Sequence, residues 1–288
     1  MIERLCIIGT GLIGGSLARA LRLAGQCREV VGCSRNPEHL QQAVDLGVID
    51  RFDTDAGQAV AGADMVLVAV PLGAMESVFS ALRGHMDAGA VLTDVGSAKA
   101  GVIEAARRGF GELPGNFVPG HPIAGTEQSG VAASFAGLFQ DRRVILTPLE
   151  QTSAAATARV RAMWEAAGAV VDEMDPAHHD AVLAATSHLP HVLAFALVDS
   201  LARLGDSDEI FRYAAGGFRD FTRIASSDPV MWRDICLANG DAILQMIDRF
   251  SGDLEQLADA VRRHDGERLQ AVFSSAKQAR DRFVDKHS

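Results

Sequence analysis

Hydrophobic residues in the first half of the chain alternate between short continuous runs and runs with helical spacing. Between the continuous runs, apolar residues recur with the period of a helix, as Leu12, Leu17 and Leu21 do. Continuous apolar runs that alternate with helices are typical of a parallel sheet covered on both faces, so this half predicts a doubly wound α/β domain. The continuous, β-branched runs predict strands at 4–9, 29–34, 64–71, 90–95, 116–121 and 142–148.

The pattern changes after residue 175. A helix over 154–168 and a strand over 169–174 are expected to join the same sheet. Beyond them the apolar residues keep a helical period and no strand is predicted, so the chain is divided into an α/β domain, 1–175, and an all-α domain, 176–288. The second domain carries more apolar residues than it needs to cover itself, which favours burial against a second copy of the chain. Examples are Leu193, Phe195, Leu197 and Val198.

Composition restricts the partners to be expected. The 288 residues carry a formal net charge of −10 and 48% of them are hydrophobic, which is enough for a core in each of two domains. Nucleic acid and anionic membrane surfaces attract clustered basic residues, and the acidic balance gives no support for either. We expect a small-molecule substrate, with no nucleic acid and no membrane.

The cysteines and the N-terminal residues indicate a compartment. Cys6, Cys27, Cys33 and Cys236 include no C-x-x-C pair, which favours buried thiols in a reducing compartment. The chain begins MIERLCIIG, without a basic leader, and no run is expected to reach the roughly 18 apolar residues of a membrane span. We therefore expect a cytoplasmic protein.

A glycine motif follows the first predicted strand. In IIGTGLIGGS, the pattern G-x-G-x-x-G places Gly9, Gly11 and Gly14 between a strand and a helix. The glycines permit a tight turn and let the backbone approach a pyrophosphate, whose charge is met by the helix N-terminus. This context predicts a dinucleotide site, with a plain glycine turn as the alternative. The expected cofactor contacts are Gly9, Thr10, Gly11, Leu12, Ile13, Gly14, Ser34, Arg35, Val70, Pro71 and Ser97.

The end of the second predicted strand bears on the choice of nucleotide. An acidic residue usually holds the ribose hydroxyls about 20 residues beyond the glycines. Ser34 and Arg35 stand there instead, so no carboxylate repels a 2′-phosphate, and a hydroxyl with a guanidinium could bind one. NADP is mildly favoured. NAD is the alternative, in which Arg35 is a solvated surface side chain.

Three predicted loops follow the carboxyl ends of strands, where ligands bind in doubly wound sheets. They contain VPLGAM, DVGSAKAG and PGHPIAGTE. His121 is the candidate for proton transfer, because its loop is expected where hydride transfer must occur and Ser97 could be its hydrogen-bonding neighbour. The alternative for His121 is a ring that only packs. Asp94 and Lys99 are expected to do structural work in their loop, by capping and pairing.

The helical half adds further candidates. In HHDAVLAATSHLPH, four polar residues are expected to line a pocket, with a metal site as the alternative. A metal is disfavoured because a proline separates the last two histidines and the H-E-x-x-H pattern is absent. Arg223 lies at a break between helices, where a guanidinium could bind a carboxylate, surface ion pairing being the alternative. The four residues are His179, Asp180, His188 and His191.

Five motifs occur in order: GTGLIGGS, DVGSAK, GHPIAGTEQSG, TSHLPH and GGFRDFTRIASSDPVMW. With them the sequence resembles, over nearly its whole length, the prephenate and arogenate dehydrogenases of tyrosine biosynthesis, also called cyclohexadienyl dehydrogenases. The resemblance implies a Rossmann-like domain followed by an all-α dimerisation domain. It also implies oxidative decarboxylation of prephenate, arogenate or both, with hydride transfer to NAD(P)+. The choice between the two substrates and any inhibition by tyrosine stay open.

The resemblance further implies a role for single residues. His121 is the catalytic base, and Ser97 positions both His121 and the nicotinamide. Glu127 gates the cleft, and Arg223 takes a substrate carboxylate. A departure from the NAD-using members is Ser34-Arg35 in place of an acid, which leaves the nucleotide open. The other implied substrate contacts are His179, Asp180, His188, His191 and, from the partner of a homodimer, Trp232.

Two other function classes are kept beside this one. A β-hydroxyacid-type NAD(P) dehydrogenase shares the two-domain plan, but that class resembles enzymes with a lysine in the helical domain, and none occurs here between Lys99 and Lys277. A non-catalytic nucleotide sensor needs the glycine motif but has no need for His121, Ser97 and Arg223 together.

Overall fold

The computed structural model describes residues 1–126, 128–205 and 207–285. The chain divides into two compact units, Met1–Gly240 and Asp241–Ser288, each of which is described by itself. The first unit contains the sheets together with the helices that follow them up to residue 240. The domain boundary expected after residue 175 stays a prediction.

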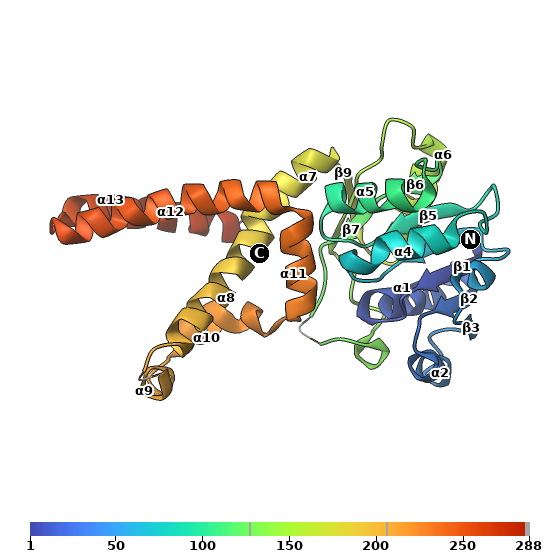
Figure 1. Cartoon of the computed structure of the whole chain (residues 1–288), viewed down its shortest axis with the longest axis horizontal. Coiled ribbons are helices and arrows are strands. Elements are labelled where there is room, and N and C mark those ends of the chain that lie inside the picture. The colour runs from blue at the N-terminus through green and yellow to red at the C-terminus, as the bar shows by residue number, and fades with distance from the viewer. Residues whose placement is uncertain (127, 206, 286–288) are drawn as a thin grey trace. The chain divides into compact units, whose positions relative to one another are not determined.

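A six-stranded parallel sheet forms the centre of the first unit, in the order β3-β2-β1-β4-β5-β6 (Figure 1). This is the strand order of dinucleotide-binding domains, in which the chain switches direction between β1 and β4. The predicted α/β, Rossmann-like class is confirmed. The strands are β1 Ile2–Ile8, β2 Cys27–Cys33, β3 Arg51–Asp53, β4 Met65–Val68, β5 Val91–Asp94 and β6 Phe117–Val118.

Helices cover both faces of this sheet, because alternate residues of each strand point to opposite faces. Leu5 and Ile7 of β1 join one core with α1 and α6, whereas Cys6 and Ile8 join the other core with α4 and α5. Phe79 is fully buried in the second core, and burial of such a side chain stabilises the fold by roughly 1.5–3 kcal/mol. The helices of this half are α1 Leu12–Leu23, α2 Pro37–Asp45, α3 Ala56–Ala59, α4 Leu72–Leu82, α5 Lys99–Phe110 and α6 Ala154–Ala166, with the short turn η1 Val131–Ala133.

A second, three-stranded sheet corrects one expectation. It has the order β7-β8-β9, with β8 antiparallel to β7 and parallel to β9. The prediction that 142–148 and 169–174 extend the main sheet is therefore wrong. The predicted strand 116–121 is divided at Pro119, which has no N–H to continue a ladder, so β6 pairs with β5 and β7 pairs with β8. The three strands are β7 Gly120–Pro122, β8 Arg143–Leu146 and β9 Val170–Glu173.

Beyond residue 175, none of the described residues is in a strand, which agrees with the predicted all-α half. Asp175 caps α7, since its side chain accepts hydrogen bonds from the backbone N–H groups of Ala177 and His178. The π-helical turn η2 lies directly before Pro190, where the helical hydrogen bonds must be rearranged. These elements are α7 Pro176–Leu183, η2 Ala184–His188, α8 Leu189–Ala202, α9 Ser207–Arg212, α10 Gly216–Thr222, η3 Arg223–Ser226 and α11 Pro229–Ala238.

One helical stretch is longer and more apolar than expected. Pro176–Ala202 has 27 residues and a mean hydropathy of 1.7 in its most apolar window, so by length and composition it could cross a membrane. The expectation that no run reaches that length is wrong. Core helices of other proteins meet the same criterion, and His179, Asp180 and His188 of this stretch are buried and hydrogen-bonded within the first unit. Ionisable side chains are costly within lipid, and 28% of the apolar window is buried in the single chain.

The second unit consists of α12 Gly240–Arg262 and α13 Gly266–Asp285. His264, in the turn between them, has a φ of 53°, and Asp265 accepts a hydrogen bond from the backbone N–H of Arg268 at the start of α13. Large apolar side chains stay exposed on both helices, among them Leu244 and Phe273. The two helices alone therefore leave apolar surface uncovered.

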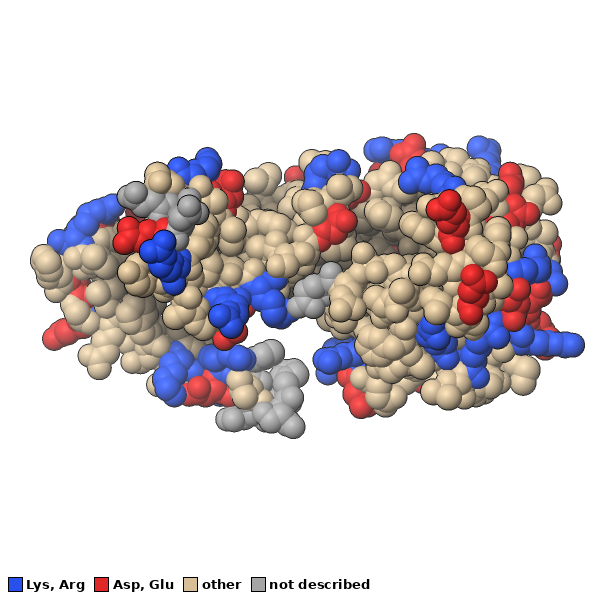
Figure 2. All heavy atoms as spheres, turned by 90° about the horizontal axis from the view of Figure 1, so that it is seen from below, with Lys and Arg blue, Asp and Glu red and all other residues tan. Residues whose placement is uncertain are grey.

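Charges are dispersed over the surface of the sheet-containing part. On the face in Figure 2, acidic and basic side chains are interspersed. Glu29, for example, lies 2.5 Å from the Nε of Arg4 and 2.7 Å from the Nε of Arg51. Such partly exposed pairs contribute little to stability individually.

Candidate active site

The glycine turn between β1 and α1 has the geometry of a phosphate cradle. Gly9 has a φ of 102°, and a Cβ built there would lie 2.3 Å from the carbonyl oxygen of Ala69. A Cβ on Gly14 would meet the carbonyl oxygen of Gly9 at 2.5 Å, whereas nothing lies within 4 Å of one built on Gly11. The first turn of α1 has no acidic residue and no side-chain cap, so its N–H groups are left for an anion. These residues fit the pyrophosphate of a dinucleotide.

The loop after β2 leaves one guanidinium available beside this cradle. The Ser34 hydroxyl donates a hydrogen bond to the Asn36 carbonyl, and the Asn36 side chain caps α2. Arg35 is exposed, and its side chain makes no ion pair with any residue that the structure describes. On the side of the cradle, Val70 and Pro71 follow β4 directly, with Val70 next to Gly9.

A buried ion pair lies beneath the site. The Lys99 Nζ is 2.6 Å from Oδ2 of Asp94, and both side chains have no exposed surface. Lys99 also donates a hydrogen bond of 2.5 Å to the carbonyl oxygen of Gly120, while Asp94 accepts hydrogen bonds from the N–H groups of Gly96 and Gly120. The pair thus joins the loop after β5 to β7. The predicted structural role of Asp94 and Lys99, by capping and pairing, is confirmed.

His121 lies in β7, opposite Ile145, rather than in a loop as expected. Its side chain is 8% exposed. Nδ1 of His121 is 2.9 Å from Nε2 of His179, and the two rings meet edge to face. Burial, followed by the neighbouring His179, Lys99 and His188, holds the pKa of His121 well below its ordinary value. The imidazole is therefore neutral at neutral pH and can accept a proton.

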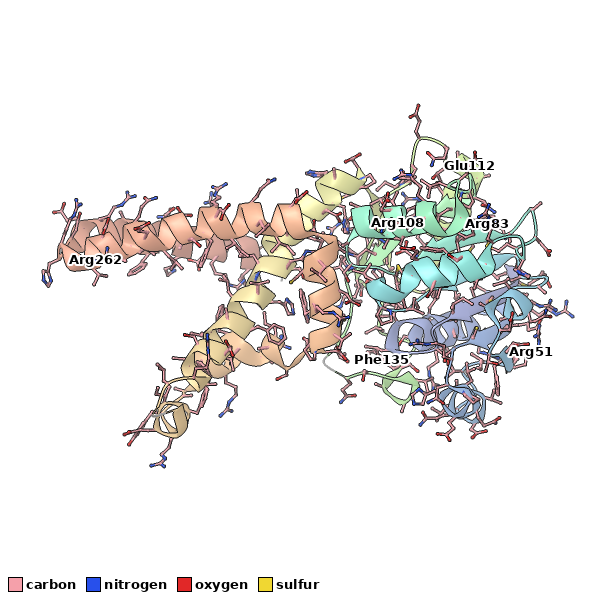
Figure 3. The ribbon with its side chains drawn as sticks, viewed as in Figure 1. Arg51, Arg83, Arg108, Glu112, Phe135 and Arg262 are labelled. Atoms are coloured by element: carbon pink, nitrogen blue, oxygen red, sulfur yellow. The ribbon has the colours of Figure 1, made fainter. Side chains whose placement is uncertain are left out.

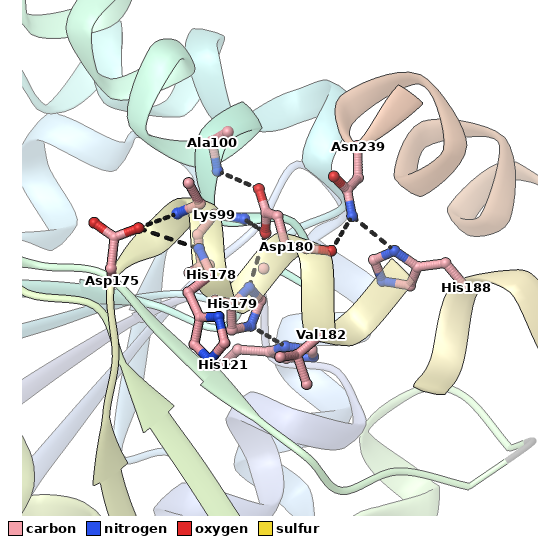
Figure 4. Close-up of polar contacts among 12 residues, drawn as sticks. Lys99, Ala100, His121, Asp175, His178, His179, Asp180, Val182, His188 and Asn239 are labelled. Atoms are coloured by element: carbon pink, nitrogen blue, oxygen red, sulfur yellow. Dashed lines mark hydrogen bonds and ion pairs between the residues drawn. The ribbon is translucent and has the colours of Figure 1, made fainter. Parts of the chain in front are cut away.

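Asp180 connects this histidine pair to helix α5. Its Oδ1 lies 2.8 Å from Nδ1 of His179 and accepts a hydrogen bond of 2.7 Å from the N–H of Lys99, and its Oδ2 accepts one of 2.8 Å from Ala100 (Figure 4). Ala98, the N-cap residue of α5, has no polar side-chain atom to accept a hydrogen bond, so Asp180 caps the helix from α7. Burial raises the pKa of Asp180, but the hydrogen bonds from His179 and the two N–H groups outweigh this effect and lower it.

His179 and Asp180 were expected to line the substrate pocket. His179 has no exposed surface and Asp180 is 4% exposed. Both ring nitrogens of His179 contact protein atoms, and both carboxylate oxygens of Asp180 do the same. Their contacts are therefore with His121 and with helix α5.

The remaining histidines lie close by on the same long helix. His188 is 1% exposed, and its Nδ1 accepts a hydrogen bond of 3.1 Å from Nδ2 of Asn239, which also donates one to the carbonyl oxygen of Asp180. Burial lowers the pKa of His188 to about 4. His191 donates from Nδ1 to the carbonyl oxygen of Ser187, and its ring stacks on Trp232 with centroids 3.7 Å apart.

Arg223 begins η3, and its side chain is exposed. Burial lowers the pKa of His191, and the charge of Arg223 lowers it further, so the guanidinium lies near that ring. Trp232 lies against His191 of its own chain; its expected contribution from a partner stays a prediction. Glu127, the expected gate, lies outside the described residues.

Sequence reasoning expected Ser97 beside His121, which stays a prediction, and it missed two residues of the site. No hydrogen bond joins the Ser97 hydroxyl to His121 in the described part of the chain; the imidazole contacts His179 instead. Asn239 and Asp234 were not predicted. Asp234 accepts a hydrogen bond of 3.2 Å from the N–H of Gly73, in the first turn of α4. No short motif marks either residue, since both act on segments far away in the sequence.

A phosphate cradle at the start of a Rossmann-like sheet, with a buried neutral imidazole in the strand that contacts the carboxyl end of β5, defines a pyridine-nucleotide-dependent dehydrogenase. The family model for the nucleotide-binding domain of prephenate dehydrogenase matches residues 17–173, and the one for its dimerization domain matches residues 175–275. The chain belongs to the prephenate dehydrogenase family. The predicted family and the predicted enzyme class, an NAD(P)-linked oxidoreductase, are confirmed.

Known relatives match almost the whole chain. It is 40% identical to the cyclohexadienyl dehydrogenase of Zymomonas mobilis over 97% of this chain and 96% of that protein. The prephenate dehydrogenase of Aquifex aeolicus, solved with hydroxyphenyl propionate and NAD+, is 38% identical with a TM-score of 0.91 over 97% of this chain and 98% of that one. The arogenate dehydrogenase of Synechocystis is 28% identical with a TM-score of 0.82, over 98% and 100%.

Proposed function

We propose that this protein oxidises and decarboxylates prephenate, arogenate or both, giving 4-hydroxyphenylpyruvate or tyrosine, and passes the hydride to NAD(P)+. The observation that carries the proposal is His121. It is a neutral imidazole with one nitrogen held by His179, and it lies in β7 next to Gly120, whose N–H contacts Asp94 at the carboxyl end of β5. The family supports the substrate class, since its relatives are named for prephenate, arogenate and cyclohexadienyl substrates.

The reaction needs few groups from the protein. NAD(P)+, when bound, supplies the hydride acceptor. The substrate carries a ring hydroxyl on the carbon that loses hydride and a carboxylate on the opposite ring carbon. His121 takes the hydroxyl proton as hydride leaves the same carbon, and the ring carboxylate leaves as carbon dioxide. The electrons of the broken C–C bond complete the aromatic ring, and the resulting phenolate oxygen takes the proton back from His121. Neither a metal nor a covalent nucleophile takes part in these steps.

Other residues have supporting roles in this proposal. Arg223 binds a substrate carboxylate, because a planar guanidinium matches its two oxygens. His188, His191 and Trp232 border the ring, and Ser97, in the loop between β5 and α5, lies next to the nicotinamide. Glu127 is proposed to gate the cleft.

NADP is proposed as the preferred nucleotide, with NAD as the alternative. The exposed Arg35 is free to meet a 2′-phosphate, and no acidic residue follows β2 directly. The Aquifex aeolicus relative was solved with NAD+, so the preference must be measured for this chain.

We also propose a cytoplasmic homodimer that associates through the helical half. The family names this half a dimerization domain. Leu244 and Phe273 expose 58% and 59% of their surface in the single chain, which a second copy could cover. The four cysteines are free thiols, as is usual in a reducing compartment.

The test is a matrix of substrates and nucleotides. Prephenate and arogenate are each mixed with the purified protein and with NAD+ or NADP+, and the absorbance of the reduced nucleotide is followed together with carbon dioxide release. We expect one reduced nucleotide for each carbon dioxide. Reduction with β-hydroxyacids but with neither cyclohexadiene would favour the β-hydroxyacid class. Binding of nucleotide without turnover of any substrate would favour a sensor.

A further inference from the structure

Three buried groups lie in series between helix α5 and the proposed base. The Asp180 carboxylate contacts Nδ1 of His179 at 2.8 Å, and Nε2 of His179 contacts Nδ1 of His121 at 2.9 Å. All three side chains are at most 8% exposed. Figure 4 shows these contacts continuing from the N–H groups of Lys99 and Ala100. Within this series, His121 makes its contact through Nδ1, and its other nitrogen, Nε2, takes no part in these contacts.

The positions of the protons follow from what each group can donate. An ionised carboxylate only accepts hydrogen bonds, so the contact with Asp180 places a hydrogen on Nδ1 of His179. A neutral His179 then has a lone pair on Nε2, and the 2.9 Å contact requires a hydrogen on Nδ1 of His121. The remaining nitrogen of His121, Nε2, is left with the lone pair that a base needs.

The other arrangement has a doubly protonated His179, which would donate to Nδ1 of His121 and leave the hydrogen on Nε2. That form would place a second cation beside Lys99 in a site without exposed surface. The negative charge of Asp180 does not require a cationic His179, because two backbone N–H groups and the positive end of helix α5 already stabilise this carboxylate. A neutral His179 is therefore favoured.

We propose that His179 and Asp180 are positioning residues that hold His121 in the tautomer with its hydrogen on Nδ1, so that Nε2 faces the substrate as the base. This inference rests on the proposed role of His121. The same contacts fix the direction of the ring. When His121 takes the proton, the Asp180 charge stabilises the imidazolium through His179. The charge of the neighbouring Lys99 opposes this effect.

The arrangement also depends on helix α7 lying against α5. Asp180 reaches His179 on its own helix and caps α5 on the sheet side at the same time. His121 belongs to β7 of the second sheet. The Asp180 carboxylate of α7 thus contacts α5 directly and reaches β7 through His179. A shift of α7 would separate His121 from His179.

Two substitutions separate this role from simple packing. His179→Gln keeps a side-chain oxygen that can accept the hydrogen of His121 Nδ1, whereas His179→Leu fills similar space without an acceptor. His178→Leu is the matched control, because His178 is the exposed neighbour on the same helix. Loss of the group that orients a catalytic imidazole costs up to about 10⁴-fold in kcat in serine proteases, and a general base as a whole contributes about 10²–10⁴-fold.

We expect His179→Leu to lower kcat at least about tenfold, to shift the acidic limb of the pH profile, and to leave KM for the nucleotide unchanged. His179→Gln should restore most of kcat, and His178→Leu should behave as wild type. If His179→Leu kept the wild-type kcat and pH profile, the positioning role would be refuted while the dehydrogenase activity stood. A wild type inactive on prephenate and arogenate would refute the proposed function instead.

A second measurement uses only the wild-type protein and does not depend on activity. Nitrogen NMR of labelled imidazoles, with the His121 signals assigned by their loss in His121→Asn, reports which nitrogen carries the hydrogen. We expect a protonated Nδ1 and an unprotonated Nε2 on His121 at neutral pH. A His121 with its hydrogen on Nε2 would overturn the inference even if the enzyme were fully active.

Discussion

Replacing Lys99 with methionine tests the buried ion pair beneath the site. Lys99→Met removes the ammonium that contacts Asp94 at 2.6 Å and the Gly120 carbonyl at 2.5 Å, in a place without exposed surface. Removal of one partner from a buried pair costs about 3–5 kcal/mol, because the other charge stays buried and unpaired. Asp94 keeps two backbone N–H donors, so we expect the lower part of that range, equivalent to about a hundredfold in the folding equilibrium.

The assay is urea unfolding at neutral pH, followed by the fluorescence of the two buried tryptophans, Trp232 and Trp164, the second of which lies beside Phe139. Arg108→Met is the matched control on the same helix. Arg108 extends into solvent (Figure 3) and pairs with Glu104 and Glu76 in exposed positions, so its loss should change the free energy of unfolding by about 1 kcal/mol or less.

A double-mutant cycle then measures the coupling itself. Adding Asp94→Asn to Lys99→Met removes the stranded charge while keeping an acceptor oxygen, so the double variant should regain part of the loss, with a coupling of at least about 1 kcal/mol. If Lys99→Met cost no more than Arg108→Met, or if the two changes were additive, the pair would not hold β7 in place. The proposed structural role of the Lys99–Asp94 pair beneath the site would then be wrong.

Three further predictions concern the nucleotide, the substrate and acid stability. Arg35→Ala should raise KM for NADP much more than KM for NAD; equal effects would refute a 2′-phosphate contact. Arg223→Ala should lower kcat/KM for the cyclohexadiene at least about tenfold with nucleotide affinity unchanged, since a charge-assisted contact is worth on the order of 1.5–3 kcal/mol; an unchanged kcat/KM would return Arg223 to the surface. Folding keeps His188 neutral, with its pKa lowered by burial to about 4. The unfolded chain binds a proton at His188 below its pKa of about 6.5, and the folded protein does so only near pH 4. The free energy of unfolding therefore keeps its full value above about pH 6.5 and falls, by on the order of 3 kcal/mol, as the pH drops towards 4. His188→Asn should flatten this decline in urea unfolding, and an unaltered decline would contradict the assignment.

The sequence predicted most of the sheet because its strands are short apolar runs. Strand β3 was missed, since it has three residues and two of them, Arg51 and Asp53, are charged. Strands β8 and β9 were recognised but placed in the wrong sheet. Periodicity identifies a strand, whereas its partner depends on the direction that the chain takes after Pro119, which no local pattern encodes.

The site was predictable to the extent that its chemistry is local. The glycine cradle and the neighbouring Lys99 and Asp94 are marked by spacing within a few residues. The contact between His121 and His179 joins residues 58 apart in the sequence, so spacing could not reveal it, and Ser97 was chosen as the neighbour instead. The same holds for Asn239, which acts on His188 through folding alone.

The most direct test of the central claim is the pH dependence of kcat/KM for the wild type and for His121→Asn. Burial, and then the neighbours His179, Lys99 and His188, lower the pKa of His121. Because the neutral ring is the base, activity should rise with pH through a limb below the ordinary histidine value of about 6.5. His121→Asn keeps much of the ring's size but cannot take the proton. We expect it to lower kcat at least about a hundredfold, to abolish that limb, and to bind nucleotide as the wild type does. A variant with wild-type kcat and the same acidic limb would show that another group is the base.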